Sequence, residues 1–264
     1  MLKIHIVNHL GIDVIKVLDK TFGILEEIAK ATPRPVGPLE LAKRLGLNRA
    51  TCSRILRMLL DSGYILKVSR QAGYVAGPRI LTLGSMAGFQ SELLRKAVPV
   101  VDRTAAATLG AALISQVYAG ERYVLYLKNR IPDRVIKLAE LSFDDVFNTA
   151  TGVVEAAYMD EAERMALYGS VAERGGEMLP EFRDRGMLAG VFSGIRDDKM
   201  YHCLKGELGI FAAPVFAGGR FVAALGCSIT RERYAGECIS ATAQCLSAAA
   251  AELSAALSSI GSVG

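Results

Sequence analysis

Residues 39–64, LELAKRLGLNRATCSRILRMLLDSGY, carry two short helical patterns joined by a tight turn. Gly46 supplies the positive φ at which a helix commonly ends, and Asn48 is a good N-cap for the second helix. Four apolar residues of that helix recur at helical spacing and form its predicted inward face: Cys52, Ile55, Leu56 and Leu59. The stretch therefore predicts a helix-turn-helix, a motif whose second helix enters the DNA major groove.

The outward face of the second helix is basic and polar, which suits contact with DNA. Its candidate contact residues are Asn48, Arg49, Ala50, Ser53, Arg54 and Arg57. Arginine can pair bidentately with guanine O6 and N7, which gives about 1–3 kcal/mol of discrimination between bases. The alternative interpretation is a solvated helical hairpin whose arginines form ion pairs within the domain.

Two β-prone runs, residues 64–68 and 74–76, follow this helix and flank a polar turn that contains Gly73. A hairpin at this place is typical of a wing, so the prediction becomes a winged helix-turn-helix. Lys67 and Arg70 of the hairpin are further candidates for contact with backbone phosphates.

The charge distribution assigns a polyanionic partner to the first part of the chain. Residues 1–90 hold 13 Lys and Arg against 6 Asp and Glu, whereas residues 91–264 hold 18 against 21. The first part therefore has a net charge of +7 and the second a net charge of −3. This difference favours double-stranded DNA as the partner of the first part.

Other functional classes find little support in the sequence. No apolar run approaches the roughly 18 residues that span a bilayer, and the N-terminus lacks a signal-peptide core, so a cytoplasmic protein is expected. The five cysteines show no metal-ligand spacing with the three histidines. No nucleophile–base pair or phosphate-binding glycine loop is evident. We therefore expect no metal site, no cofactor and no catalytic residues.

At 264 residues the chain is long enough for two domains. The expected divisions are an N-terminal arm (1–12), a winged helix-turn-helix domain (13–77), an apolar linker helix region (78–101) and a second domain (102–264). The linker helix either forms a dimer seam or packs on its own second domain. In the second domain we expect hairpins at residues 111–128 and 209–229, a further strand at 135–138, and helices at 153–159, 160–168, 178–185 and 237–259.

The chain resembles the IclR family of bacterial transcriptional regulators over roughly residues 15–260. The resemblance rests on LAKRLGLNRATCSRILRMLLDSGYI, YVAGPRILTLGSM, NTATGVVEAAYM and LGIFAAPVFAGGRFVAALGCSI. It implies an α+β protein with a winged helix-turn-helix, a linker helix and a GAF-like effector-binding domain of antiparallel sheet flanked by helices. It also implies homodimers, often paired into homotetramers, that bind palindromic operators as repressors or activators.

The chain departs from the family pattern at residues 147–148, where members commonly carry a His, and at residues 153–155, where they carry a basic residue. Residues 186–207 also depart from it. These departures leave the effector open.

The predicted effector site begins at the start of the helix after residue 148. Backbone N–H groups and hydroxyls there can hold a carboxylate. The candidates in this loop are Thr149, Ala150, Thr151 and Gly152. By resemblance, two strands complete the pocket with Ile210, Phe211, Ala212, Gly226 and Ser228. An apolar lining with few polar groups suits a small organic or aromatic acid. The alternative is that the threonines only cap the helix.

Two other functions compete with a ligand-responsive regulator. In the first of these, the second domain is an enzyme. In the second, it is a scaffold that only oligomerises. An enclosed pocket with convergent polar groups favours the sensor, and a closed core favours the scaffold.

Overall fold

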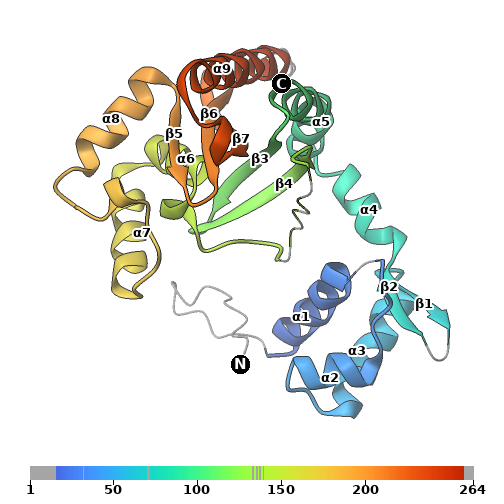
Figure 1. The fold of residues 1–264 in the computed structure, drawn as a ribbon. Helices are drawn as coiled ribbons and strands as arrows, with labels where there is room; N and C mark the ends of the chain where they lie inside the picture. Colours follow the sequence, from blue (N-terminus) through green and yellow to red (C-terminus); the bar gives the residue numbers. More distant parts are fainter. Residues whose placement is uncertain are drawn as a thin grey trace. The chain divides into compact units, whose positions relative to one another are not determined.

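The computed structural model describes residues 16–31, 33–69, 72–132, 134, 136, 138 and 140–258. By its internal contacts the chain divides into two compact units (Figure 1). The first comprises Met1–Ser91 with Ala139–Leu141, and the second comprises Glu92–Leu138 and Ser142–Gly264. The expected N-terminal arm, residues 1–12, lies outside the described residues.

The first unit combines helices with a two-stranded hairpin. Its elements are α1 (Lys16–Ala31), α2 (Pro38–Arg44), α3 (Arg49–Asp61), β1 (Ile65–Ser69) and β2 (Gly73–Ala76). The strands pair antiparallel, with Leu66 opposite Val75. The core joins α1, α2, α3 and β1 through fully or almost fully buried side chains that include Ile24, Ile28, Leu41, Leu56 and Ile65. The predicted winged helix-turn-helix is therefore confirmed.

The linker region differs from the single helix expected over residues 78–101. It consists of α4 (Pro78–Ser85) and α5 (Phe89–Thr108). Gly88 lies between them with φ at 59°, a conformation in which a right-handed helix does not continue. The boundary between the two units falls early in α5, after Ser91.

The second unit is built on a five-stranded antiparallel sheet in the order β4-β3-β7-β6-β5. Its strands are β3 (Ala111–Tyr118), β4 (Glu121–Asn129), β5 (Tyr201–Lys205), β6 (Leu208–Ala217) and β7 (Arg220–Thr230). Both predicted hairpins are confirmed, and pairing of β3 with β7 joins them into one sheet. The edge strand β5 was not predicted. Of the strand expected at 135–138, residues 135 and 137 lie outside the described residues.

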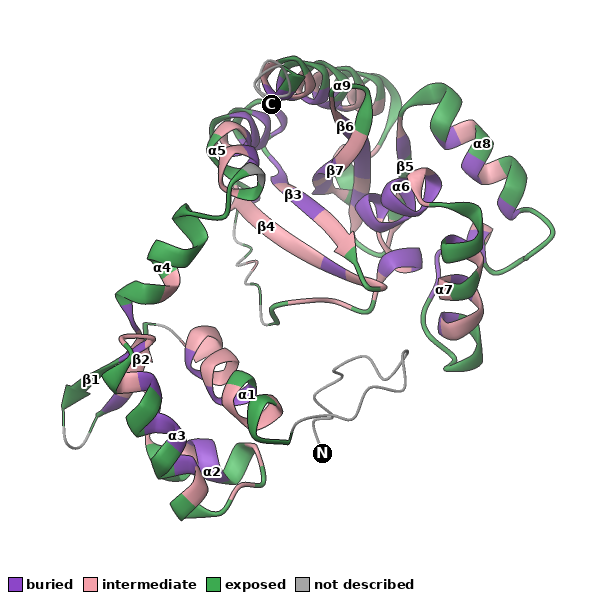
Figure 2. Cartoon of the chain, turned by 180° about the vertical axis from the view of Figure 1, so that it is seen from behind, coloured by how far each residue is buried: buried purple, intermediate pink, exposed green. Residues whose placement is uncertain are grey.

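Helices cover both faces of this sheet (Figures 1 and 2). They are α5, α6 (Ala150–Tyr158), α7 (Glu161–Glu173), α8 (Leu188–Asp198) and α9 (Gly236–Ser258). One core cluster joins α5 and α9 to the face that carries Phe211 and Leu225. A second joins α6, α7 and α8 to the face that carries Ala212 and Ala224. The predicted α+β class, with an antiparallel sheet flanked by helices, is confirmed.

Two helical details differ from the sequence prediction. The helix expected over residues 178–185 is only a 3₁₀ turn, Pro180–Phe182. Helix α8 lies where no element was predicted. Within the described part of the chain, no helix is both long enough and apolar enough to cross a membrane.

Candidate functional site

The start of α3 is fixed by local hydrogen bonds. The side-chain oxygen of Asn48 accepts a hydrogen bond from the Thr51 amide at 2.7 Å, as expected of an N-cap. Gly46 adopts φ of 62°, and the Leu47 amide donates to the Ala42 carbonyl at 2.9 Å to close the turn. The four residues predicted to face inward are all buried: Cys52, Ile55, Leu56 and Leu59. The orientation of α3 about its axis is thereby set.

The predicted DNA-contact residues on α3 lie on its opposite, exposed side. The exposed set is Asn48, Arg49, Ala50, Ser53, Arg54 and Arg57. Among the described residues, no ion pair or side-chain hydrogen bond engages Arg49, Arg54 or Arg57. Lys67 on β1 is also exposed, whereas Arg70 lies outside the described residues. Three arginines on one helix therefore present their guanidinium groups to solvent.

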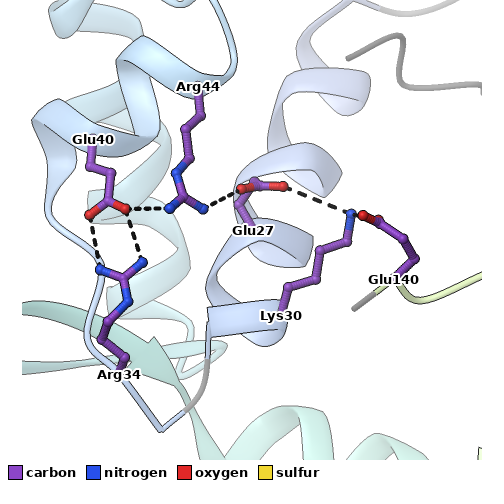
Figure 3. A network of polar contacts seen from close by, with 6 residues as sticks. All are labelled: Glu27, Lys30, Arg34, Glu40, Arg44 and Glu140. Atoms are coloured by element: carbon purple, nitrogen blue, oxygen red, sulfur yellow. Dashed lines mark hydrogen bonds and ion pairs between the residues drawn. The ribbon is translucent and has the colours of Figure 1, made fainter. Parts of the chain in front are cut away.

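Three other cations of the first unit, Lys30, Arg34 and Arg44, are paired in a network that the sequence did not predict (Figure 3). Arg34 binds Glu40 through two hydrogen bonds, and Arg44 contacts Glu40 at 2.6 Å and Glu27 at 3.0 Å. The paired Arg34 guanidinium lowers the pKa of Glu40. Figure 3 also shows Lys30 between Glu27 and Glu140; its ammonium lies 2.5 Å from the Glu140 carboxylate. The i, i+4 spacing of Glu40 and Arg44 was the available sequence signal.

This contrast separates two kinds of basic residue. The network ties α1 to α2 and to the loop between them. The arginines of α3 form no ion pair that would join elements among the described residues. Among the described residues, none of the α3 arginines forms the ion pair that the alternative interpretation requires.

The N-terminus of α6 carries the first part of the predicted effector site. Thr149 is its N-cap: the hydroxyl accepts from the Gly152 amide at 3.3 Å and donates to the Asp145 carbonyl at 3.2 Å. Thr149 therefore caps the helix, as the alternative interpretation of the threonines expected. Ala150 and Thr151, the first two residues of the helix, are almost fully buried. Thr149 itself is half-buried, so this helix end is only partly open to a ligand.

The predicted strand residues fall on both faces of the sheet. Ile210 pairs with Ser228 and Ala212 with Gly226, so these four lie on the α6 side. Phe211 pairs with Cys227, and both belong to the core between the sheet and α9. Placing Phe211 in the same pocket as Ile210 and Ala212 was wrong, because successive residues of a strand point to opposite faces.

Thr151 and Gly226 come together at the centre of the predicted site. A Cβ at Gly226 would lie 2.5 Å from the Thr151 methyl carbon and 3.5 Å from Leu113 side-chain atoms. Similarly, a Cβ at Gly152 would lie 2.2 Å from the Val146 carbonyl oxygen. Both glycines thus permit close packing of α6, on the sheet and on the preceding turn.

Glu155 lies one helical turn beyond Thr151 in α6 and is 2% exposed. One carboxyl oxygen accepts a hydrogen bond from the Ser115 hydroxyl at 2.6 Å, while the other has no partner among the described residues. Burial raises the pKa of Glu155 to about 8, against the opposing effects of the Ser115 hydrogen bond and the charge of Arg122. Sequence analysis missed this group, since a single glutamate in a helix gives no sign of burial.

No group of three or more His, Cys, Asp or Glu side chains is placed to hold a metal ion within the described residues. The described cysteines are free thiols, and burial raises the pKa of the Cys227 thiol to about 11. Such a thiol is protonated at neutral pH and therefore a poor nucleophile.

Comparison with known proteins finds a matching DNA-binding family and solved structures of similar fold. The family described as winged helix-turn-helix DNA-binding matches residues 18–65. No curated protein matches the sequence. Solved structures of similar fold include an IclR transcriptional regulator from Alicyclobacillus acidocaldarius, at 21% identity and a TM-score of 0.73, covering 92% of this chain and 98% of that one.

Two further structures match at similar coverage. An IclR homolog from Microbacterium hydrocarbonoxydans, complexed with 4-hydroxybenzoate, has 16% identity and a TM-score of 0.75, and the match covers 92% of this chain and 99% of that one. Thermotoga maritima IclR has 18% identity, a TM-score of 0.69, and coverage of 92% and 99%. The resemblance to the IclR family is thereby confirmed at the level of the fold, from the winged helix-turn-helix through the helix-flanked sheet.

Proposed function

We propose that the chain is a transcriptional regulator of the IclR type whose α3 binds the major groove of double-stranded DNA. The observation that carries this proposal is the exposed face of α3. Arg49, Arg54 and Arg57 are free of ion pairs among the described residues, while Arg34 and Arg44 of the same unit are paired. The winged helix-turn-helix match over residues 18–65 and the similarity in fold to solved IclR regulators support it.

Replacing Arg54 tests this function. Arg54→Ala should weaken binding to an operator selected from a random duplex pool by roughly 5- to 150-fold at fixed salt, the equivalent of about 1–3 kcal/mol. The side chain is exposed and unpaired among the described residues, so the melting temperature should not change. Fluorescence anisotropy measures the affinity.

The control is Arg103→Ala, which removes the same charge from α5 in the second unit, where Arg103 pairs with Glu252. It should leave operator affinity unchanged. Equal affinities of wild type and Arg54→Ala would refute the assignment of Arg54.

We further propose that the second unit senses a small organic or aromatic acid and so modulates operator binding. The similar fold of the homolog complexed with 4-hydroxybenzoate supports an aromatic acid. In this proposal the start of α6, from Thr149 to Gly152, moves to bind the acid. The acid then lies between the helix start and the sheet residues on the same side, which are Ile210, Ala212, Gly226 and Ser228. Thermal-shift measurements with a panel of such acids test it, and no shift with any acid would count against it.

The chain should act as a homodimer, or a dimer of dimers, on a palindromic operator. Helix α4 contains no buried residue, and Leu81, Leu83 and Met86 at its surface are 78%, 51% and 76% exposed. Leu83 and Met86 are about one helical turn apart and so lie on one face, where exposed apolar side chains favour association. In this proposal the regulator binds chromosomal DNA in the cytoplasm, and the similarity in fold to solved IclR regulators favours regulation over enzymatic activity.

A further inference from the structure

The second unit has an open cleft beside the predicted effector loop. Its volume is about 660 Å³, within the range of roughly 300–1,000 Å³ typical of small-molecule sites. The walls come from the end of α7, the following residues 175–180, the end of β5 and Asn148. None of the predicted effector-binding residues lines this cleft. The lining residue nearest to them in sequence is Asn148, which precedes Thr149.

Two cations line the cleft without a carboxylate partner among the described residues. The Lys205 ammonium donates to the Asn148 carbonyl at 2.6 Å, and the Arg183 Nε donates to the Met178 carbonyl at 3.3 Å. Both acceptors are neutral. The cleft also holds one carboxylate, Glu177, whose Oε2 accepts from the Asn148 side-chain amide at 2.8 Å. The lining therefore carries a surplus of one positive charge.

The rest of the lining is largely apolar and firmly packed. Tyr168, Met178 and Leu179 are 7%, 8% and 2% exposed and belong to the core beneath α6, α7 and α8. Only the edges of these side chains reach the cleft, and Leu204, which is 39% exposed, adds the apolar surface that is open to a ligand. Tyr168 is itself held edge-on against Phe147, with ring centroids 5.5 Å apart.

The cleft wall is anchored at both ends of residues 175–179. The Gly176 amide donates to the Val171 carbonyl at 2.9 Å, which ends α7, and the Leu179 amide donates to the Phe147 carbonyl at 2.9 Å. A wall fixed in this way is preformed, so less conformational entropy is lost when a ligand binds.

We propose that this cleft binds a small organic anion, with its carboxylate held by Lys205 and Arg183 and its apolar body on Leu204 and the accessible edges of Tyr168 and Met178. An ammonium has three donors and a guanidinium has five, so both cations can keep their present carbonyl partners and still bind a carboxylate. The charge-assisted bonds so formed are stronger than those to neutral carbonyls.

Binding here also has a route to α6. Lys205 donates to the backbone carbonyl of Asn148, and Glu177 accepts from its side-chain amide. The next residue, Thr149, is the N-cap of α6. An anion bound to Lys205 competes with the Asn148 carbonyl for the ammonium, which weakens the hydrogen bond between them and so changes the support of the helix start. Only this regulatory consequence rests on the proposed function; the binding itself does not.

The test uses the full-length chain labelled with ¹³C at the methionine methyl groups. The Met178 resonance, assigned with Met178→Leu, reports on the cleft from within. Benzoate and adipate are the anionic probes, and benzamide is the neutral analogue of benzoate. Benzoate should shift the Met178 resonance saturably, and benzamide should bind at least about tenfold more weakly, because it lacks the charge that strengthens hydrogen bonds to cations.

Lys205→Met and Arg183→Met should each weaken benzoate binding by about tenfold or more, because each removes a charge-assisted donor. Arg185→Met is the matched control, since Arg185 is exposed and does not line the cleft, and it should bind benzoate as wild type does. Melting temperatures of the variants establish that they fold.

The proposal is overturned if neither anion moves the Met178 resonance at about 10 mM, a weak affinity even for small ligands. It is equally overturned if folded Lys205→Met and Arg183→Met bind benzoate as tightly as wild type. Operator binding by the same samples separates the two claims. Retained DNA binding without anion binding refutes the cleft alone, and the reverse refutes DNA regulation alone.

Discussion

Glu155 should make the stability of the second unit depend on pH. Its folded-state pKa of about 8 lies above its ordinary value of 4.5, so the folded state holds a proton that the unfolded state has lost between these two pH values. Unfolding then releases a proton, and the free energy of unfolding falls as pH rises through this window. Glu155→Gln should flatten the decline in melting temperature between pH 5.5 and 8.

The matched control is Glu252→Gln, which changes a carboxylate whose side chain is 58% exposed. It should leave the pH profile of the melting temperature close to that of wild type. If Glu155→Gln and wild type declined in parallel, Glu155 would not be the titrating group, whatever its burial.

The contact of Gly226 with Thr151 gives a second prediction at single residues. Gly226→Ala should destabilise the second unit by about 1–3 kcal/mol, the usual effect of overpacking, because the new Cβ lies 2.5 Å from the Thr151 methyl carbon. Thr151→Ser removes that methyl group and should restore much of the lost stability in the double variant. Urea denaturation of the four proteins measures the coupling, and additive effects would contradict the contact.

Single residues also show how far sequence alone reaches. The inward and outward faces of α3 were predictable because helical periodicity fixes them. The side of Phe211 was predictable in principle, since strand alternation sets it opposite Ile210 and Ala212. The pairing of Ser115 with Glu155, forty residues apart, was not, because no local pattern encodes a contact between β3 and α6.

Helix α4 is the element on which the proposed dimer depends. Leu81→Asp together with Leu83→Asp should convert the proposed dimer to a monomer, because both side chains are more than half exposed and apolar. The fold should survive, since α4 has no buried residue. Sedimentation equilibrium measures the mass.

Met187→Asp serves as the control for that experiment, since it puts a charge at a residue of the second unit that is 56% exposed. It should leave the mass unchanged. A double α4 variant that still sedimented at twice the chain mass would show that the dimer forms elsewhere.

The elements that the sequence predicted well have strong local signals. Both hairpins of the second unit combine β-prone runs with glycine turns at Gly120 and Gly218, which adopt positive φ. Helix α8 was missed because Gly190 and Gly194 weaken its helical pattern, each by about 1 kcal/mol relative to alanine. Strand β5 was missed because it is a short edge strand whose outer residues are polar or exposed.

For the whole molecule, the proposed mechanism joins a basic DNA-binding unit to a second unit that senses an acid. The cleft escaped sequence analysis because Arg183 and Lys205 come from separate segments that only the folded sheet and its loops bring to one cavity. An anion bound in the second unit alters DNA affinity only if it binds two conformations of the chain with different free energies. The sign of that effect is decided by operator titrations with and without the anion.

The central claim is that α3 lies in the major groove, and guanine N7 methylation by dimethyl sulfate on the selected operator tests it most directly. Wild-type protein should protect guanines in each half-site, because N7 faces the major groove. Arg54→Ala should lose protection at particular guanines and keep it at others when bound at saturation. A wild-type complex that leaves every N7 open to methylation would contradict the account.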